Sequence, residues 1–466
     1  MKRRDFIAKG ALGTALGSLS IPLIATPKNL KIKGTIKENK ETGIAGDYDV
    51  VVCGAGPAGV SAAIEAGRMG AKTLLIEVHG SLGGVWTAGL LGWIVDHTQH
   101  GGLMDEIREK IAAINGVSPI NTGPNFAVDP EKMKLLLEDL CVDANVDLIY
   151  HTRVVDAVKN ENNRITHVIT ESKSGREAWS GKIFIDTTGD GDVAALVGNG
   201  FDLGDKMGRT QPMTLLCVVG GPQFSEIEPY IRYIGDEKKR EAKRNLLGLL
   251  EQAGIEPSIL KPGLFPIKDD LYMLMGNHMH GYSSWNNRDV TKATILARKE
   301  THKLVEGLKG IGGPWSKLRL VSTAEQIGTR EGRRIHGLYE ITTKDITSGA
   351  RFKDAVCRVK YSVDVHPLTK EEEKNKIAYS HGLKSMPFDV PIRSLIARDV
   401  AGLMMAGRCI SGDFYAHATY RQTGDAVPMG QSAGRVAALA VQKNILPQEV
   451  KWNDVGITVE DSFSSF

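Results

Sequence analysis

The 466-residue sequence has few cysteines, little net charge and, beyond its first 26 residues, no apolar run long enough to cross a bilayer. The cysteines show neither CxxC nor CxxCH spacing. We therefore expect no disulfide framework, no cysteine-ligated iron–sulfur cluster and no attached c-type haem. The net charge is only +3, and no basic stretch is interleaved with aromatic residues. We expect no nucleic-acid partner. The five cysteines are Cys53, Cys141, Cys217, Cys357 and Cys409.

The first 26 residues contain a double arginine, Arg3 and Arg4, followed by an aromatic residue and a weakly apolar, glycine-containing run. This pattern resembles a twin-arginine export signal and predicts a periplasmic protein. A basic anchor helix is the alternative. The signal has no clear Ala-x-Ala site at its end, so membrane attachment through an uncleaved segment stays open. Residues 27–46, polar and lysine-rich, are predicted to be a linker.

A βαβ pattern stands between residues 47 and 77. A β-branched run, Val50 to Val52, is followed by a glycine motif, an alanine-rich helix predicted for residues 58–69 and a strand predicted for 73–76. The strand ends in Glu77. Strand, helix, second strand and terminal acid together predict a dinucleotide-binding fold. The motif residues are Gly54, Gly56, Pro57, Ala58 and Gly59.

Each residue type in this motif has a physical role. Gly54 permits a tight turn, Gly56 lets the backbone approach a pyrophosphate, and Gly59 lets the helix pack closely on the strand. The helix N-terminus then faces the phosphates. Glu77 would accept hydrogen bonds from ribose hydroxyls and would repel a 2′-phosphate, which favours FAD or NAD over NADP. The alternative is a glycine-rich turn without a ligand.

Two further loops favour FAD. The doublet Gly83 and Gly84 opens a glycine-dense stretch that lets the backbone approach a long ligand. A loop of alternating acids follows the strand predicted for 182–185, and it lacks the spacing of an EF-hand. We interpret it as a loop beside the flavin. The residues of this loop that we expect at the cofactor are Thr188, Gly189 and Asp190.

The remaining pattern indicates an α/β fold with an inserted mixed α+β region. Strands are predicted at 146–150, 153–158, 165–171, 213–219, 271–275, 318–323, 338–342, 356–363, 389–395 and 403–406, and helices at 103–114, 129–140, 236–252, 290–308 and 428–442. The strand at 146–150 should extend the parallel sheet, and the next two should form a hairpin or meander. The predicted domains are a Rossmann-like FAD domain in two parts, 47–202 and 386–445, a substrate or cap domain at 203–385, and a tail at 446–466.

Together these motifs resemble the bacterial FAD-dependent oxidoreductases that have a glutathione-reductase-like flavin domain and one inserted substrate domain. The resemblance extends over nearly all of residues 47–440 and implies bound FAD. It includes Gly407-Arg408 where the wider superfamily has Gly-Asp or Gly-Glu. Arg408 is therefore expected at the pyrophosphate or ribityl chain. The helix predicted to start at Pro428 should direct its N-terminus at the flavin, which brings in Met429, Gly430 and Gln431. An ordinary terminal helix is the alternative.

The resemblance places the loop 411–423 beside the flavin ring. From this loop we expect His417 to carry a proton and Arg421 to hold a substrate oxygen, unless both simply bind cofactor phosphate or the other domain. The predicted function is a dehydrogenase or oxidase that transfers a hydride between a small polar substrate and FAD. Quinone, a periplasmic carrier or oxygen would be its electron partner. A reductase of an activated double bond and a non-enzymatic electron-transfer subunit are the alternatives. The remaining histidines predict no metal site.

Overall fold

The computed structural model describes residues 34, 36–98, 100–118, 126–232 and 236–459. The predicted export signal lies outside these residues. The chain divides into two units, Met1–Glu38 and Asn39–Phe466. All elements described below belong to the second unit.

A seven-stranded sheet has the strand order β5-β2-β1-β8-β7-β6, and β17 also pairs with β8. β1, β2, β5, β8 and β17 pair in parallel, whereas β6, β7 and β8 form an antiparallel meander. Both arrangements confirm the predicted α/β fold. The strands are β1 (Gly43–Cys53), β2 (Thr73–Ile76), β5 (Val146–Ile149), β6 (Arg153–Lys159), β7 (Ile165–Ser172), β8 (Gly175–Asp186) and β17 (Leu403–Met405).

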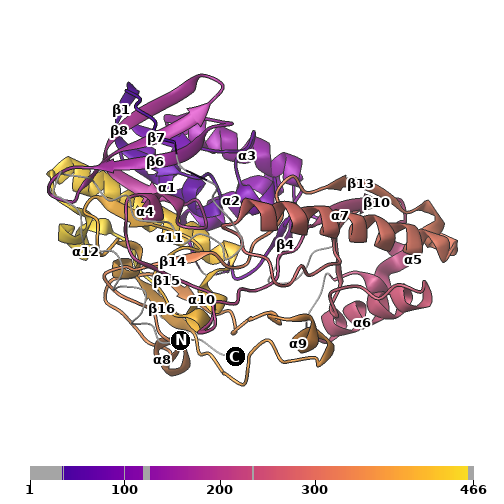
Figure 1. Cartoon of the computed structure of the whole chain (residues 1–466). Coiled ribbons are helices and arrows are strands. Elements are labelled where there is room, and N and C mark those ends of the chain that lie inside the picture. Colours follow the sequence, from indigo (N-terminus) through magenta and orange to yellow (C-terminus); the bar gives the residue numbers. More distant parts are fainter. Residues whose placement is uncertain (1–33, 35, 99, 119–125, 233–235, 460–466) are drawn as a thin grey trace. The chain divides into compact units, whose positions relative to one another are not determined.

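Two helices from opposite ends of the second unit pack against each other beside this sheet (Figure 1). They are α1 (Pro57–Arg68) and α11 (Thr423–Lys443). Glycines on α11 allow the close approach, because a Cβ at Gly430 would lie 2.0 Å from the Ala58 carbonyl oxygen, and one at Gly434 would lie 2.2 Å from that of Ala62. The C-terminal helix is therefore part of the same core as β1.

Helices α2 (Gly102–Ala113) and α3 (Pro130–Asp143) complete this layer. The predicted start of α3 is confirmed, since the Asp129 side chain accepts hydrogen bonds from the backbone N–H groups of Glu131 and Lys132.

The middle of the chain forms an antiparallel sheet in the order β11-β12-β10-β13, with a separate apolar core. Its strands are β10 (Cys217–Gly220), β11 (Gly263–Lys268), β12 (Leu271–Met275) and β13 (Arg319–Thr323). Helix α7 (Asn287–Gly310) lies beside β13, and α6 (Asp236–Gln252) has the predicted bounds (Figure 1). The mixed α+β character matches the prediction, whereas the predicted domain boundaries stay predictions.

Short elements connect these layers. β9 pairs with β14, β15 with β16, and β3 with β4. The elements are β3 (Trp93–Ile94), β4 (Phe126–Ala127), α4 (Asp192–Leu196), β9 (Phe201–Leu203), α5 (Phe224–Ile227), β14 (Arg333–Ile335), α8 (Thr343–Ser348), β15 (Ala355–Val359), α9 (Lys370–Lys374), β16 (Phe388–Pro391), α10 (Phe414–Tyr420) and α12 (Trp452–Val455), together with 3₁₀ turns at Gly84–Trp86, Glu228–Tyr230, Gly313–Lys317, Ile392–Leu395 and Pro447–Glu449.

Several predicted strands are wrong. Residues 338–342 form no strand, and the strand of that region is β14, which pairs with β9. The segment predicted at 389–395 becomes β16, which pairs with β15 rather than with the parallel sheet, and then a 3₁₀ turn. The strand predicted at 213–219 shortens to β10 because Met213 and Thr214 make only isolated bridges.

The C-terminal helix predicted at 428–442 is present as α11, but its predicted start is wrong, because α11 begins at Thr423 and Pro428 lies inside it. Its first turn is polar and contains a glycine, which hid it in the sequence.

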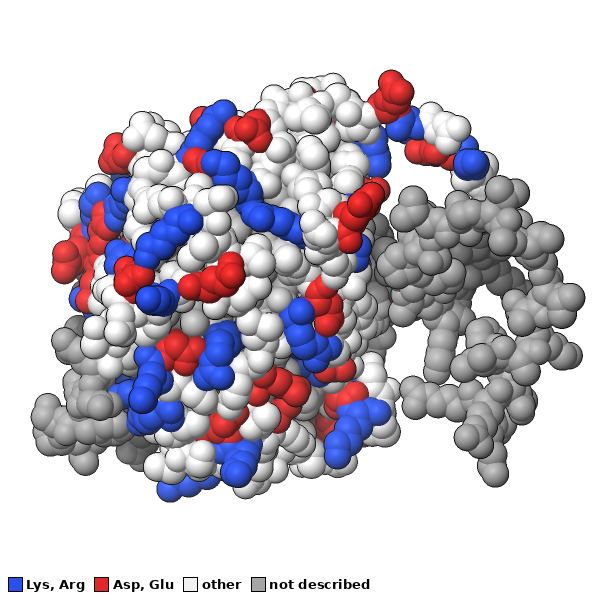
Figure 2. Space-filling model, turned by 90° about the vertical axis from the view of Figure 1, so that its left-hand side faces the viewer, with Lys and Arg blue, Asp and Glu red and all other residues white. Residues whose placement is uncertain are grey.

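Among the described residues, none of the helices has the length and apolar character needed to span a membrane. On the face shown in Figure 2, basic and acidic side chains are interspersed over the surface. This face carries no large area of one charge sign.

Candidate functional site

A cavity of about 960 Å³ opens at the carboxyl ends of β1, β2 and β8. This volume is near the upper end of the range for small-molecule sites in proteins. Eleven of the predicted site residues line it, and six do not. Those that line it are Gly54, Gly56, Pro57, Ala58, Glu77, Gly84, Thr188, Gly189, Asp190, Arg408 and Arg421. Those outside the lining are Gly59, Gly83, His417, Met429, Gly430 and Gln431.

The three motif glycines differ in what surrounds them. A Cβ at Gly59 would lie 1.8 Å from the Gly54 carbonyl oxygen, and one at Gly54 would lie 2.6 Å from the Thr187 carbonyl oxygen. Gly54 also has a φ of +95°. In contrast, a Cβ at Gly56 would meet no atom within 4 Å. Gly59 therefore packs the helix on the strand, whereas Gly56 borders open cavity at the N-terminus of α1.

The buried Glu77 carboxylate braces the glycine turn. One of its oxygens accepts a hydrogen bond from the backbone N–H of Ala55 at 2.6 Å, and the other accepts from that of His79 at 2.9 Å. A carboxylate has about four lone-pair sites, so both oxygens retain capacity to accept a ribose hydroxyl. Glu77 thus has a structural role in addition to its predicted role in cofactor binding.

The acidic loop is organised by Asp186 at the end of β8. Its carboxylate accepts hydrogen bonds from the backbone N–H groups of Thr188 and Ala194, and burial raises its pKa to about 6. Asp190 in this loop forms a 2.6 Å ion pair with Arg408, whose guanidinium also donates to the Thr329 carbonyl oxygen at 3.2 Å. Arg408 therefore lies in the cavity wall with Asp190 as its partner.

A second group of cavity-lining side chains surrounds two arginines. Arg421 donates to the Asp364 carboxylate at 3.1 Å, and Arg330 donates to the Pro212 carbonyl oxygen and the Thr214 hydroxyl. Burial, together with the charge of Arg421, lowers the pKa of Arg330 to about 10. Burial opposes ionisation of Asp364, but His366 and the two guanidinium groups hold the pKa of its carboxyl well below the usual range. The group is therefore charged and net cationic.

The structure does not place His417 at the cavity. The segment predicted as a loop contains α10, which Asp413 caps, and this helix turns His417 into the core. Burial and the nearby arginines lower the pKa of the imidazole well below its ordinary value. Met429, Gly430 and Gln431 are likewise not at a helix N-terminus, and Gln431 bonds to Leu103 and Glu65 instead. The helix end that reaches the cavity is Gln422–Thr423.

Several residues of this second group were missed by sequence reasoning. Arg330 stands in the sequence Gly328-Thr329-Arg330-Glu331, to which no role was assigned. Asp364 and His366 stand two residues apart in a segment without helix or strand, where no periodicity predicts which side chains meet. No sequence motif pointed to Tyr379 or Lys261 as a site residue, because each reaches the cavity from a segment without a motif. Their grouping depends on contacts between residues far apart in the sequence.

A parallel sheet with a glycine-lined helix N-terminus and a terminal acid defines a dinucleotide-binding enzyme. The family model for FAD dependent oxidoreductases matches residues 49–458, and the chain belongs to this family. It is an enzyme with FAD as its cofactor.

Similarity to individual proteins is partial. The chain is 31% identical over 142 residues to a tRNA uridine 5-carboxymethylaminomethyl modification enzyme of Desulfitobacterium hafniense, covering 28% of this chain and 22% of that protein. It is 29% identical over 153 residues to the thiamine thiazole synthase of Methanococcus maripaludis, covering 31% of this chain and 56% of that protein. A solved flavin-dependent brominase aligns over 88% of this chain and 81% of its own, with 13% identity and a TM-score of 0.46.

The cavity fits the cofactor of this family. Gly56 leaves room for phosphate at a helix N-terminus, where orphan N–H groups and the helix dipole favour an anion. Glu77 would hold the adenosine ribose. We propose that Thr188, Gly189, Asp190, Arg408 and the Gln422–Thr423 helix end contact the rest of the FAD.

Glu331 makes stability depend on pH. This buried carboxyl pairs with Arg334 at 2.7 Å, yet burial raises its pKa to about 7. A carboxyl whose pKa is raised by folding stabilises the protein at low pH, and this contribution is lost as pH rises from about 4.5 to 7. In the parental protein the free energy of unfolding should fall by on the order of 3 kcal/mol across this pH window, and we expect Glu331→Gln to abolish this fall. Urea unfolding at pH 5 and pH 8 measures it.

The control for the Glu331 prediction is Glu306→Gln, at an exposed position of α7. An equal change in pH dependence for both variants would contradict the assignment to Glu331.

Proposed function

We propose that this enzyme transfers a hydride between FAD and a small organic substrate that carries a carboxylate. The observation that supports this substrate class is the pair Arg330 and Arg421, which line the same cavity as the glycine motif. Lys261 adds a third cation, and Asp364 is the carboxylate that faces them. Because the α1 N-terminus is the site expected for the cofactor phosphates, the arginine pair is available to a second anion.

Arg421 is arranged to position such a substrate. Its Nη2 atom contacts Asp364 and Gln211, whereas its Nε atom has no hydrogen-bond partner among the described residues. The Asp364 contact fixes the plane of the guanidinium, so the remaining N–H groups can bind an oxygen in one orientation. Bound FAD supplies the group that accepts or donates a hydride.

Tyr379 is the side chain that we assign to the proton step in place of His417. Tyr379 lines the cavity, and its buried hydroxyl has no hydrogen-bond partner in the described structure. Burial and the nearby charge of Glu373 raise the pKa of this hydroxyl well above its ordinary value, so the hydroxyl stays protonated at neutral pH. A donor favours the reductive direction, in which a proton is delivered to the substrate. Reduction of a double bond conjugated to a carboxylate is therefore the second candidate.

An anaerobic flavin assay tests both directions. We expect 2-hydroxy or amino acids to bleach the oxidised flavin, or unsaturated acids to restore the colour of chemically reduced flavin, with saturation in substrate. The matched controls are the methyl esters of the same compounds, which lack the charge that the arginines would bind. If esters and neutral polyols react as well as the acids do, the proposed substrate class is wrong.

We further propose that the electron partner is a quinone, a periplasmic carrier or oxygen rather than NAD(P)H. The βαβ glycine motif is assigned to FAD, and the sequence contains no second GxGxxG motif. Rapid and saturable reduction of the flavin by NADH would contradict this proposal.

Export through the twin-arginine route is proposed from Arg3 and Arg4, and from a cofactor that has to be inserted before translocation. Replacing both residues with lysine should leave the FAD-loaded protein in the cytoplasm, as measured by cell fractionation. The control replaces Lys31 and Lys33 with arginine, which preserves charge in the predicted linker. Normal delivery of the double-lysine variant to the periplasm would contradict this route.

A further inference from the structure

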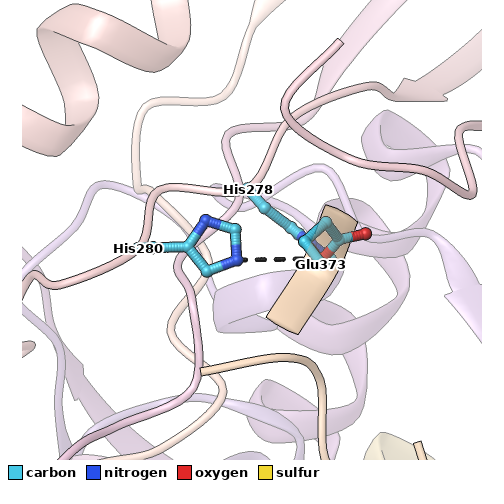
Figure 3. Close-up of side chains that lie close together, drawn as sticks. All are labelled: His278, His280 and Glu373. Atoms are coloured by element: carbon cyan, nitrogen blue, oxygen red, sulfur yellow. Dashed lines mark hydrogen bonds and ion pairs between the residues drawn. The ribbon is translucent and has the colours of Figure 1, made fainter. Parts of the chain in front are cut away.

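Three side chains with metal-binding atoms meet beside the arginine group. His278 and His280 follow β12, and Glu373 comes from α9, almost a hundred residues later in the chain. The Glu373 Oε2 atom lies 2.9 Å from His278 Nδ1 and 3.7 Å from His280 Nε2. Figure 3 shows both imidazoles directed at this carboxylate. The one nitrogen that each imidazole offers and a carboxylate oxygen all lie within 4.8 Å of one another.

The outer nitrogen of His278 is held by a second histidine. His278 Nε2 lies 3.1 Å from His366 Nδ1, and His366 Nε2 lies 3.4 Å from Asp364 Oδ2. The arrangement is a chain from carboxylate to imidazole to imidazole. Metal-binding histidines characteristically have their other nitrogen bonded in this way, which fixes the tautomer and the ring orientation.

This chain has one contact more than it has N–H groups to donate. Asp364, His366, His278 and Glu373 make three successive contacts, and two neutral imidazoles supply one N–H each. If His366 donates to Asp364 and His278 donates to His366, the bare Nδ1 lone pair of His278 faces the Glu373 carboxylate. In this tautomer a cation between the two atoms, which lie 2.9 Å apart, would stabilise the contact. In the other tautomer His278 Nδ1–H donates to Glu373, and the 3.4 Å contact between His366 and Asp364 is the one without a proton.

His280 provides an independent observation. Only 4% of its side chain is exposed, and neither ring nitrogen has a hydrogen-bond partner among the described residues. A buried imidazole without a partner costs free energy unless another group satisfies it. Its Nε2 atom is directed at the same carboxylate oxygen, so a single cation could satisfy His280, His278 and Glu373 together.

We propose that His278, His280 and Glu373 bind one divalent transition-metal ion, with Zn²⁺ as the best match. Two imidazole nitrogens and one carboxylate oxygen are a common zinc ligand set, and water would complete four-coordination. The other Glu373 oxygen accepts a hydrogen bond from the backbone N–H of Leu260, which holds the carboxylate in place. This proposal departs from the expectation that the histidines predict no metal site.

The metal would connect the loop after β12 to α9 across the cavity wall. His366 and Asp364 link this position to Arg421, whose guanidinium borders the cavity. A metal that holds His278 in one orientation would therefore also hold the hydrogen-bond chain that ends at Arg421. The ion positions cavity residues and is not assigned a step in the reaction.

Metal content of the FAD-loaded protein is the first test. We expect about one equivalent of zinc per chain by elemental analysis after purification without chelators. His280→Ala and Glu373→Gln should each lower it at least tenfold, and His366→Gln should weaken Zn²⁺ affinity about ten- to hundredfold, as outer partners of metal ligands do. The matched control is His302→Ala, at an exposed position of α7, which should retain the metal. FAD absorbance and circular dichroism report whether each variant is folded.

A titration of the parental protein tests the same site without a variant. After removal of metal with a chelator, added Co²⁺ should give a visible difference spectrum of a four-coordinate ion that saturates at one equivalent and is displaced by Zn²⁺. If the parental protein neither contains nor binds metal, the proposal is wrong. The cation shared by the histidines and Glu373 would then be an additional proton on one of the imidazoles. Metal retained by His280→Ala would also overturn the proposal, by locating the ion elsewhere, for example at Asp96, His100 and Asp425.

Discussion

Gly56→Val is expected to leave a folded protein that no longer holds FAD. A Cβ at this position meets no protein atom within 4 Å, so the substitution fills the cavity rather than the core. The side chain would occupy the space in which the backbone approaches the cofactor phosphates. Loss of one charge-assisted hydrogen bond costs about 1.5–3 kcal/mol, which corresponds to about a ten- to hundredfold weaker affinity for each bond lost. Flavin absorbance and FAD titration of the apoprotein measure the effect.

Two variants make the Gly56 result specific. Gly248→Val introduces the same side chain into α6, where a Cβ also meets no atom within 4 Å, and it should retain FAD. Gly59→Ala places a methyl group 1.8 Å from the Gly54 carbonyl oxygen and should lower thermal stability. Normal FAD affinity in Gly56→Val would show that the cofactor phosphates lie elsewhere.

Arg421→Met is expected to reduce kcat/KM for a carboxylate substrate about a hundredfold or more while FAD stays bound. The expected loss corresponds to one or two charge-assisted hydrogen bonds to the substrate. Asp364 would lose its guanidinium partner as well, so the melting temperature should fall. Arg421→Lys restores the charge without the planar donor pair and should recover only part of the activity. Steady-state kinetics with the substrate identified in the flavin assay provide the measurement.

Arg435→Met is the matched control for Arg421→Met. Arg435 lies on α11 and bonds to the buried Glu65 at 2.6 Å, and neither residue lines the cavity. The Arg435→Met substitution removes an arginine–carboxylate pair, so it should lower stability without changing KM. Equal kinetic losses in both variants would mean that Arg421 supports the fold and does not bind substrate.

The cofactor half of the site was predictable because its signals are local. The glycine motif, the alanine-rich helix and Glu77 lie within about thirty residues, and each has a sequence pattern with one structural meaning. The strand predicted at 73–76 has those bounds in the structure. The parallel pairing of β5 was also predictable, because buried strands that alternate with helices form such sheets.

The C-terminal part of the site was harder to predict, because two sequence signals were each compatible with two structures. Proline is common at the first helical position, but Pro428 sits inside α11, six residues into the helix. Its missing N–H and its ring affect the carbonyl four residues earlier, which belongs to Gly424. The helix nevertheless begins at Thr423 and continues through the proline. His417 was placed at the flavin from its position in a polar stretch, whereas α10 turns this side chain into the core.

The arginine group was not predictable from spacing. Arg330, Asp364, Tyr379 and Arg421 come from four separate segments that only the complete fold brings to one cavity. No periodicity connects them, and a single sequence gives no information about which distant residues meet. For the same reason, no sequence pattern predicted that Glu373 lies beside His278 and His280.

The packing of α11 on α1 has a consequence for biosynthesis. The first βαβ unit leaves the ribosome early, but the close approach of Gly430 and Gly434 to α1 requires a helix that is synthesised more than 350 residues later. Strand β17, which completes the parallel sheet at β8, is also made late. A nascent chain that ends before α11 exposes the apolar face of α1 and lacks the Gln422–Thr423 wall of the cavity. We therefore expect FAD to be loaded only after α11 has been synthesised, and a chain arrested before residue 423 should emerge without flavin.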